Sequence, residues 1–193
     1  MKNIRKNYPP GDFGVWVIIY IELLTFGLFF AGYIYSRRAD VELFNASQLL
    51  LDTKSGFVNT LILITSSYFV VKAVQAIKTM QLQEAIEKAQ RWLLSAIGLG
   101  GMFLIIKMSE FISKYQDGIN LSTNKFFMFY FLLTAFHFMH VMLGMIILFN
   151  LYNKTKIGGY TKDDHRGLES GASYWHMVDL LWIVLFPLIY IIR

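Results

Sequence analysis

The sequence predicts an all-α, polytopic membrane protein in which five transmembrane helices form one bundle. Hydrophobic residues make up 55% of the 193 residues and charged residues only 16%, whereas a soluble domain carries about 25% charge. Five apolar stretches are each long enough to cross a bilayer core, which takes about 20 helical residues. In lipid the backbone must satisfy its own hydrogen bonds, so we expect all five to be helices. They cover residues 13–35, 57–77, 92–112, 126–152 and 174–192, and we expect residues 1–193 to form a single domain.

The first stretch follows a basic N-terminus, as the apolar core of a signal peptide would. Its apolar run is too long for a signal peptide, contains Glu22 and lacks a small-x-small cleavage site. We therefore expect residues 13–35 to be a retained helix.

The longest loop and the last two stretches add three expectations. The loop Ser36–Gly56 is expected to hold a short amphipathic segment, because it contains the apolar residues Val41, Leu43, Phe44, Leu49 and Leu50. The 27-residue stretch 126–152 exceeds the bilayer core, so its helix must tilt or project from the membrane. Pro187 has no backbone N–H, which predicts a gentle kink in the last helix.

The distribution of basic residues predicts the orientation. The N-terminus and the second and fourth loops carry ten of them: Lys2, Arg5, Lys6, Lys78, Lys88, Arg91, Lys154, Lys156, Lys162 and Arg166. The opposite side carries six: Arg37, Arg38, Lys54, Lys114, Lys125 and Arg193. Basic residues accumulate on the cytoplasmic side, so we expect the N-terminus in the cytoplasm and the C-terminus outside. The net charge of +5 is then a property of the membrane flanks and does not indicate nucleic-acid binding.

Glu22 is the first of several ionisable residues inside the spans. It lies about 14 Å along its helix, near the midplane, where an uncompensated carboxylate is costly. We therefore expect it to be protonated or paired. Two interpretations stay open, a proton relay and a structural hydrogen bond to His140, which lies at a similar depth.

Three other sets of polar residues share helix faces at a spacing of three residues. His137 and His140 are candidates for metal or haem ligation or for hydrogen bonds between helices. A two-haem site needs histidines on a facing helix, and the only other span histidine is His176, so we expect no metal and no cofactor. His176 with Asp179 is interpreted as a packing contact, and Lys107 with Glu110 as a possible ion pair.

Cysteine is absent, which excludes disulfides, thiolate metal sites, iron–sulfur clusters and cysteine nucleophiles. The sequence has no Walker loop, no dinucleotide-binding glycines and no serine elbow. It therefore predicts no catalytic residues.

Four segments carry a resemblance to a known family. YWHMVDLLW at 174–182 resembles the YWHxVDxxW signature in the last helix of subunit III of the haem–copper oxidases, the cytochrome c oxidase subunit III family. FHFMHVMLG at 136–144 resembles that family's FHxxHVxxG. IELLTFGLFF at 21–30 and the NTL…SS segment at 59–67 resemble its two earlier helices, and all four segments follow the family order.

The resemblance implies a bundle without its own redox centre that sits beside catalytic subunit I in the bacterial inner membrane. It also implies a role in sustained proton uptake and complex stability, and phospholipid binding. The family glutamate maps onto Glu22, the family histidines onto His137, His140 and His176, and the aspartate onto Asp179. The alternative is a small proton channel or transporter using Glu22. Five spans do not divide into the two equal halves typical of transporters.

The chain has five spans where the longest family members have seven. The lipid cleft that the two extra helices form is therefore expected to be absent. The segments Pro10–Trp16 and Trp182–Pro187 look most like the NorE-type branch, which is associated with nitric oxide reductase. The implied partner is subunit I of a haem–copper oxidase or of a nitric oxide reductase.

The orientation is tested with fusions to alkaline phosphatase, which is active only outside the cytoplasm. A fusion after Arg193 is expected to be active. A matched fusion after Tyr160, in the fourth loop, is expected to be inactive. The reverse activities would contradict the predicted topology.

Overall fold

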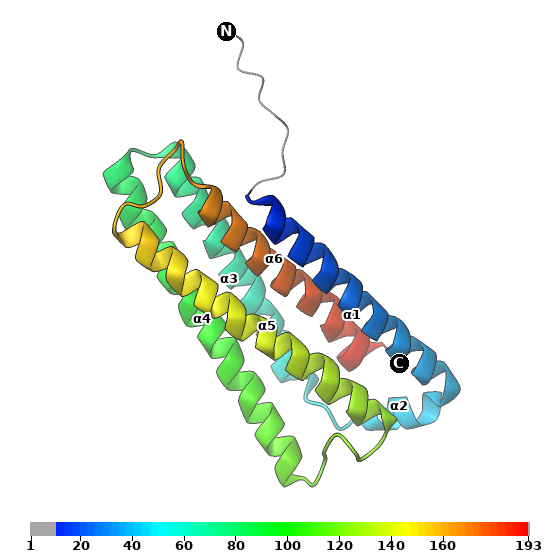
Figure 1. Cartoon of the computed structure of the whole chain (residues 1–193). Coiled ribbons are helices and arrows are strands. Elements are labelled where there is room, and N and C mark those ends of the chain that lie inside the picture. Colours follow the sequence, from blue (N-terminus) through cyan, green and yellow to red (C-terminus); the bar gives the residue numbers. More distant parts are fainter. Residues whose placement is uncertain (1–10, 193) are drawn as a thin grey trace.

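The computed structural model describes residues 11–192, and this part of the chain is helical with short connections (Figure 1). The elements are α1 (Phe13–Ala39), α2 (Val41–Gln48), α3 (Thr53–Thr79), α4 (Leu82–Gln116), α5 (Lys125–Lys156), α6 (Arg166–Phe186) and the π-helix η1 (Pro187–Ile191). Five helical segments are long and apolar enough to cross a membrane, which confirms the predicted architecture. Lys2, Arg5, Lys6 and Arg193, which entered the orientation argument, lie outside the described residues.

The long helices extend beyond the apolar stretches that predicted them. The last helix begins at Arg166 and not near residue 174, and α4 adds ten residues before residue 92. The added turns of α4 and α6 are polar, and neither helix has a side-chain hydrogen bond at its N-cap. Other helix starts are capped by a side chain. Asp52, for example, accepts hydrogen bonds from the backbone N–H groups of Lys54 and Ser55 at the start of α3. Hydropathy therefore located the lipid-crossing part of each helix and missed its ends.

Helix α6 is the centre of the bundle. It packs against α1, α3 and α5, and α4 completes the bundle through contacts with α3 and α5 (Figure 1). Among the five long helical segments, the one that contains α6 is the most enclosed and α1 is the least. Helix α1 therefore presents most of its apolar surface outside the bundle.

A tryptophan packed against two glycines fixes the distance between α6 and its neighbours. A Cβ atom at Gly144 of α5 would lie 2.7 Å from Cε3 of Trp175, and a Cβ at Gly100 of α4 would lie 2.9 Å from Cη2 of the same ring. Only glycine leaves room for the indole at these positions. By contrast, Gly27 and Gly98 have open space where a Cβ would stand.

The amphipathic segment expected in the first loop is the helix α2. Its Phe44 is fully buried and meets the rings of Tyr33 and Phe126 edge-on, at centroid distances of 5.4 and 5.7 Å. This contact seats α2 across the end of the bundle where α1 ends and α5 begins.

The irregularity expected at Pro187 is a π-helical turn. Proline cannot donate to the preceding turn, so the helix widens, and Ile192 N–H donates to the Pro187 carbonyl at 2.9 Å. Gln48 of α2 supports the exposed end of this turn. Its side-chain amide donates to the carbonyls of Ile189 and Ile192, at 2.8 and 3.0 Å.

The glycine packing predicts opposite effects for two alanine substitutions. Gly144→Ala forces the new methyl group against Trp175 and is expected to destabilise the bundle by about 1–3 kcal/mol. The control Gly98→Ala meets open space and adds helix propensity, so it is expected to be neutral or stabilising by up to about 1 kcal/mol. Unfolding in detergent micelles measures both. Equal effects of the two variants would rule out the packing argument.

Candidate functional site

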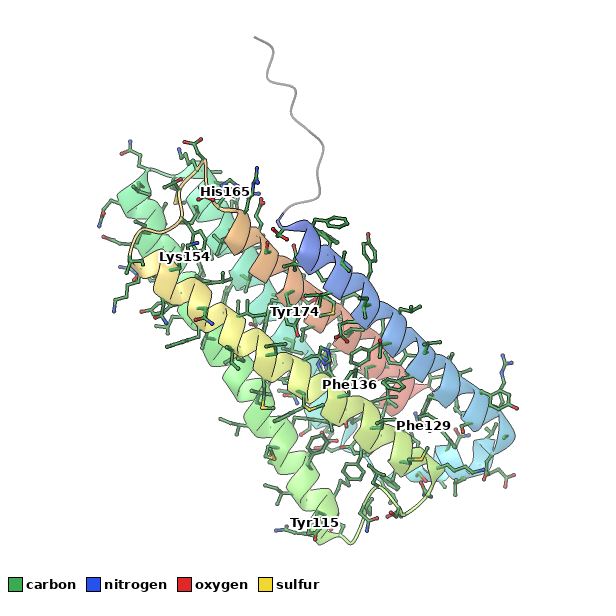
Figure 2. The ribbon with its side chains drawn as sticks, viewed as in Figure 1. Tyr115, Phe129, Phe136, Lys154, His165 and Tyr174 are labelled. Carbon is green, nitrogen blue, oxygen red and sulfur yellow. The ribbon has the colours of Figure 1, made fainter. Side chains whose placement is uncertain are left out.

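A contact between a carboxyl group and an imidazole ties α1 to α5 near the middle of the bundle. Glu22 Oε2 lies 3.0 Å from His140 Nε2, so the pairing expected from their depths is present. His140 Nδ1 lies 2.8 Å from the carbonyl oxygen of Phe136, which precedes it by one turn. Phe136 is labelled midway along α5 in Figure 2. A carbonyl only accepts, so Nδ1 carries a hydrogen. One further proton then lies between Nε2 and the carboxyl group, and the pair is neutral overall whichever atom holds it.

His137, one turn away on the same helix, has no such contact. It is fully buried, and neither ring nitrogen has a hydrogen-bond partner within residues 11–192. The ring stacks on Trp182 at a centroid distance of 5.2 Å and meets Phe103 edge-on at 5.8 Å. Within the described residues, His137 therefore makes none of the expected hydrogen bonds between helices, and its ring packs as an aromatic group.

The predicted pair of Lys107 and Glu110 is the centre of a buried four-residue cluster. Lys107 Nζ lies 3.0 Å from Glu110 Oε2, 2.5 Å from the hydroxyl of Tyr190 and 3.3 Å from that of Tyr130. Both tyrosine hydroxyls donate to Glu110 Oε1, at 2.7 Å from Tyr130 and 2.6 Å from Tyr190. The cluster therefore joins α4, α5 and η1, and the two opposite charges compensate each other.

Aromatic rings enclose the ammonium group of this cluster. Lys107 Nζ lies 5.0 Å from the ring centroid of Phe111, 4.8 Å from that of Tyr130 and 5.6 Å from that of Trp182. The negative faces of such rings attract a cation. Burial costs each ion several kcal/mol, and the ion pair, the hydroxyl groups and the rings together offset that cost.

Tyr130 and Tyr190 were not identified from the sequence as members of this cluster. Both lie in apolar runs, where a tyrosine resembles any other packing aromatic residue. The available signal was the hydroxyl itself, since a buried tyrosine hydroxyl usually finds a hydrogen-bond partner.

His176 lies nearer to α3 than to its expected partner. Its Nδ1 lies 2.6 Å from Ser67 Oγ of α3, and 3.6 Å from Asp179 Oδ2 on its own helix. The closer contact links two helices, so His176 forms part of the packing between α3 and α6, and Asp179 is its neighbour about one turn later on α6. They lie apart from the pair of Glu22 and His140.

The sequence analysis also missed the polar residues that tie the start of α1 to the start of α6. Glu169 forms an ion pair with Lys78, and its Oε2 accepts from the Gly11 N–H at 3.2 Å. Ser170 Oγ accepts from the Asp12 N–H at 2.8 Å. The two hydrogen bonds each span 158 positions of sequence, so no local pattern indicates them.

The buried cluster predicts a strongly non-additive mutant cycle. Lys107→Met leaves Glu110 without its counter-ion and is expected to destabilise the protein by about 3–5 kcal/mol. Adding Glu110→Gln removes the isolated charge and is expected to recover a large part of that loss. Unfolding in detergent measures both variants. The control Lys72→Met, in a span but not fully buried, is expected to cost less than about 1 kcal/mol. Additive effects at Lys107 and Glu110 would contradict a coupled pair.

The chain is similar in sequence to known proteins over nearly its whole length. The family described as cytochrome c oxidase subunit III matches residues 11–193. Cytochrome c oxidase subunit 3 of Thermostichus vulcanus is 30% identical over 189 residues, covering 93% of this chain and 86% of the relative. Cytochrome bo(3) ubiquinol oxidase subunit 3 of Buchnera aphidicola is 27% identical over 185 residues, covering 93% of this chain and 85% of the relative.

The similarity therefore extends over nearly the whole chain and includes relatives from both cytochrome c and quinol oxidases. It includes the segments that hold Glu22, His140 and the start of α6. The chain belongs to the cytochrome c oxidase subunit III family.

Proposed function

We propose that this chain is the non-catalytic subunit III of a haem–copper respiratory complex and that it supports the stability of catalytic subunit I. The proposal rests on how the buried ionisable side chains are paired across helices. The pair of Glu22 and His140 joins α1 to α5, and the cluster around Lys107 joins α4, α5 and η1. In each set the ionisable side chains are paired with partners within the chain, and this pairing strengthens a contact between helices.

The structural role of Glu22 is favoured over a proton relay. A relay through the bundle needs a continuous series of hydrogen-bonding groups or waters. In the described part of the chain, His137 lies between His140 and the Lys107 cluster, and its nitrogens have no partner. This gap supports a packing role and weighs against the alternative of a proton channel through the bundle.

The membrane setting extends the proposal. We place the chain in the bacterial cell membrane with its N-terminus in the cytoplasm. The outward face of α1 exposes Ile21, Leu24 and Leu28, and this face is available to subunit I and to phospholipids. The partner is subunit I of a cytochrome c oxidase or quinol oxidase, as for the relatives above, or of a nitric oxide reductase. Mass spectrometry of proteins that co-purify with the tagged chain identifies which one.

Two substitutions of Glu22 test the structural role. Glu22→Gln keeps the shape and the hydrogen-bonding capacity, so co-purification with subunit I and turnover of the complex are expected to stay near wild type. Glu22→Ala removes the partner of a largely buried imidazole and is expected to destabilise the bundle by about 1–3 kcal/mol. The yield of the complex then falls.

Two results would overturn this proposal. A normal yield of the Glu22→Gln complex with lost turnover or proton uptake would assign proton transfer to Glu22. Stoichiometric haem or copper in the purified chain alone would rule out a redox-inactive subunit.

A further inference from the structure

A cavity of about 450 Å³ lies between α3 and α6, at the end of the bundle where α3 ends and α6 begins. His165, labelled in Figure 2, marks this end of the bundle. The α3 side of the cavity runs from Val71 to Thr79 and the α6 side from Glu169 to His176. The lining residues recur at three- and four-residue intervals, so each helix contributes one face to the cavity.

Two opposite charges stand at the end of the cavity nearest the start of α6. Lys78 forms an ion pair with Glu169, and the Glu169 carboxylate also accepts a hydrogen bond from the Gly11 N–H at 3.2 Å. The two charges compensate each other, so this end of the lining presents no excess of either sign to attract an ion. The cavity therefore suits a neutral ligand.

His176 borders the opposite end of the cavity. Its Nδ1 lies 2.6 Å from Ser67 Oγ and 3.6 Å from Asp179 Oδ2. A carboxylate only accepts, so a hydrogen on Nδ1 serves both neighbours, and Nε2 of the neutral ring is then an acceptor. Among residues 11–192 this nitrogen has no hydrogen-bond partner. A ligand with a hydroxyl group at this end of the cavity would supply the missing donor.

The middle of the cavity combines polar and apolar side chains. Gln75 and Ser173 can each donate and accept, and neither side chain has a hydrogen-bond partner within residues 11–192. Val71, Val74 and Ala172 form the apolar part of the lining. Hydrogen-bonding groups at both ends with apolar side chains between them fit a flat, apolar ring that carries oxygen atoms at opposite ends.

The depth of the cavity favours such a ring over a phospholipid headgroup. His176 lies ten residues beyond the start of α6, about 15 Å along the helix, and falls within the apolar stretch 174–192. A phosphate group is costly at this depth without a free counter-charge, whereas a neutral ring is not. Farther along the same faces, Ile64 of α3 and Leu180 and Ile183 of α6 are exposed, and a hydrocarbon tail can lie against them.

We propose that this cavity binds the ring of a quinol, with one hydroxyl group donating to His176 and the other facing Lys78 and Glu169. The hydrocarbon tail leaves along the exposed apolar faces of α3 and α6. The carbonyl oxygens of the oxidised form cannot donate to His176, so the reduced form binds more tightly. The proposal uses residues of this chain alone and does not depend on the association with subunit I.

Native mass spectrometry of the full chain, purified in detergent and kept anaerobic, measures the binding of decylubiquinol and decylubiquinone separately. The wild type is expected to bind the quinol about fivefold more tightly than the quinone, the usual worth of one hydrogen bond. His176→Phe keeps a planar ring and removes the acceptor. It is expected to weaken quinol binding about fivefold and to change quinone binding less than about twofold, so that the preference for the quinol is lost.

A second variant tests the cavity without altering His176. Ser173→Leu fills part of the cavity and is expected to weaken the binding of both forms at least about tenfold. The control Thr65→Leu places the same side chain on the exposed surface of α3, outside the lining, and is expected to change binding less than about twofold. If His176→Phe does not fold, Ser173→Leu and the preference of the wild type for the quinol carry the test.

Three results would overturn the proposal. The first is equal binding of quinol and quinone by the wild type. The second is quinol binding that Ser173→Leu does not weaken. The third is full displacement of the quinol by an equal concentration of dioleoylphosphatidylglycerol, which would assign the cavity to a phospholipid. Because binding is measured on the chain alone, failure of the quinol site leaves the association with subunit I standing, and a failed co-purification leaves the quinol site standing.

Discussion

Hydrocarbon offers no hydrogen-bond partner to a side chain, and this constraint determines how the helices of this bundle are paired. A polar residue in a span has to meet another polar residue on a neighbouring helix, or an aromatic face. Glu22 meets His140 and so connects α1, the most peripheral helix, to α5. Lys107 meets Glu110 and two tyrosines, which connects α4 to α5 and to η1. The same contacts that offset the cost of burying each charge therefore select which helices lie together.

Trp182 connects these polar contacts to the apolar core. One face of the indole stacks on His137, and the ring centroid lies 5.6 Å from the ammonium group of Lys107. Its Nε1 donates to Thr60 Oγ1 of α3 at 2.9 Å. A single side chain of the central helix thus contacts α3, α4 and α5. Trp175, about two turns earlier on α6, fits against Gly100 and Gly144, so two indoles set the spacing of α6 from its neighbours.

Those features of the fold and the site that depend on a local sequence pattern could be predicted. Apolar length predicted the five spans, a spacing of three residues predicted the pair of Lys107 and Glu110, and equal depth predicted the pair of Glu22 and His140. The sequence did not predict the tyrosines that complete the Lys107 cluster, because contacts 20 and 80 residues away leave no periodic signal. It also missed the polar turns that extend α4 and α6 beyond their apolar stretches, because hydropathy does not detect them. The family resemblance of the segment 136–144 gave no indication that, among the described residues, His140 has a hydrogen-bond partner and His137 has none.

His137 shows why two histidines one turn apart have different environments. His140 faces α1, where Glu22 supplies a partner, whereas His137 faces α4 and α6, where Phe103 and Trp182 supply rings. Within residues 11–192 its two nitrogens have no hydrogen-bond partner. This carries a free-energy cost, which the stacked indole offsets through dispersion. The aromatic ring also separates the Glu22 pair from the Lys107 cluster. Within the described residues no hydrogen bond joins the two sets through His137, so each set ties α5 to its neighbours independently.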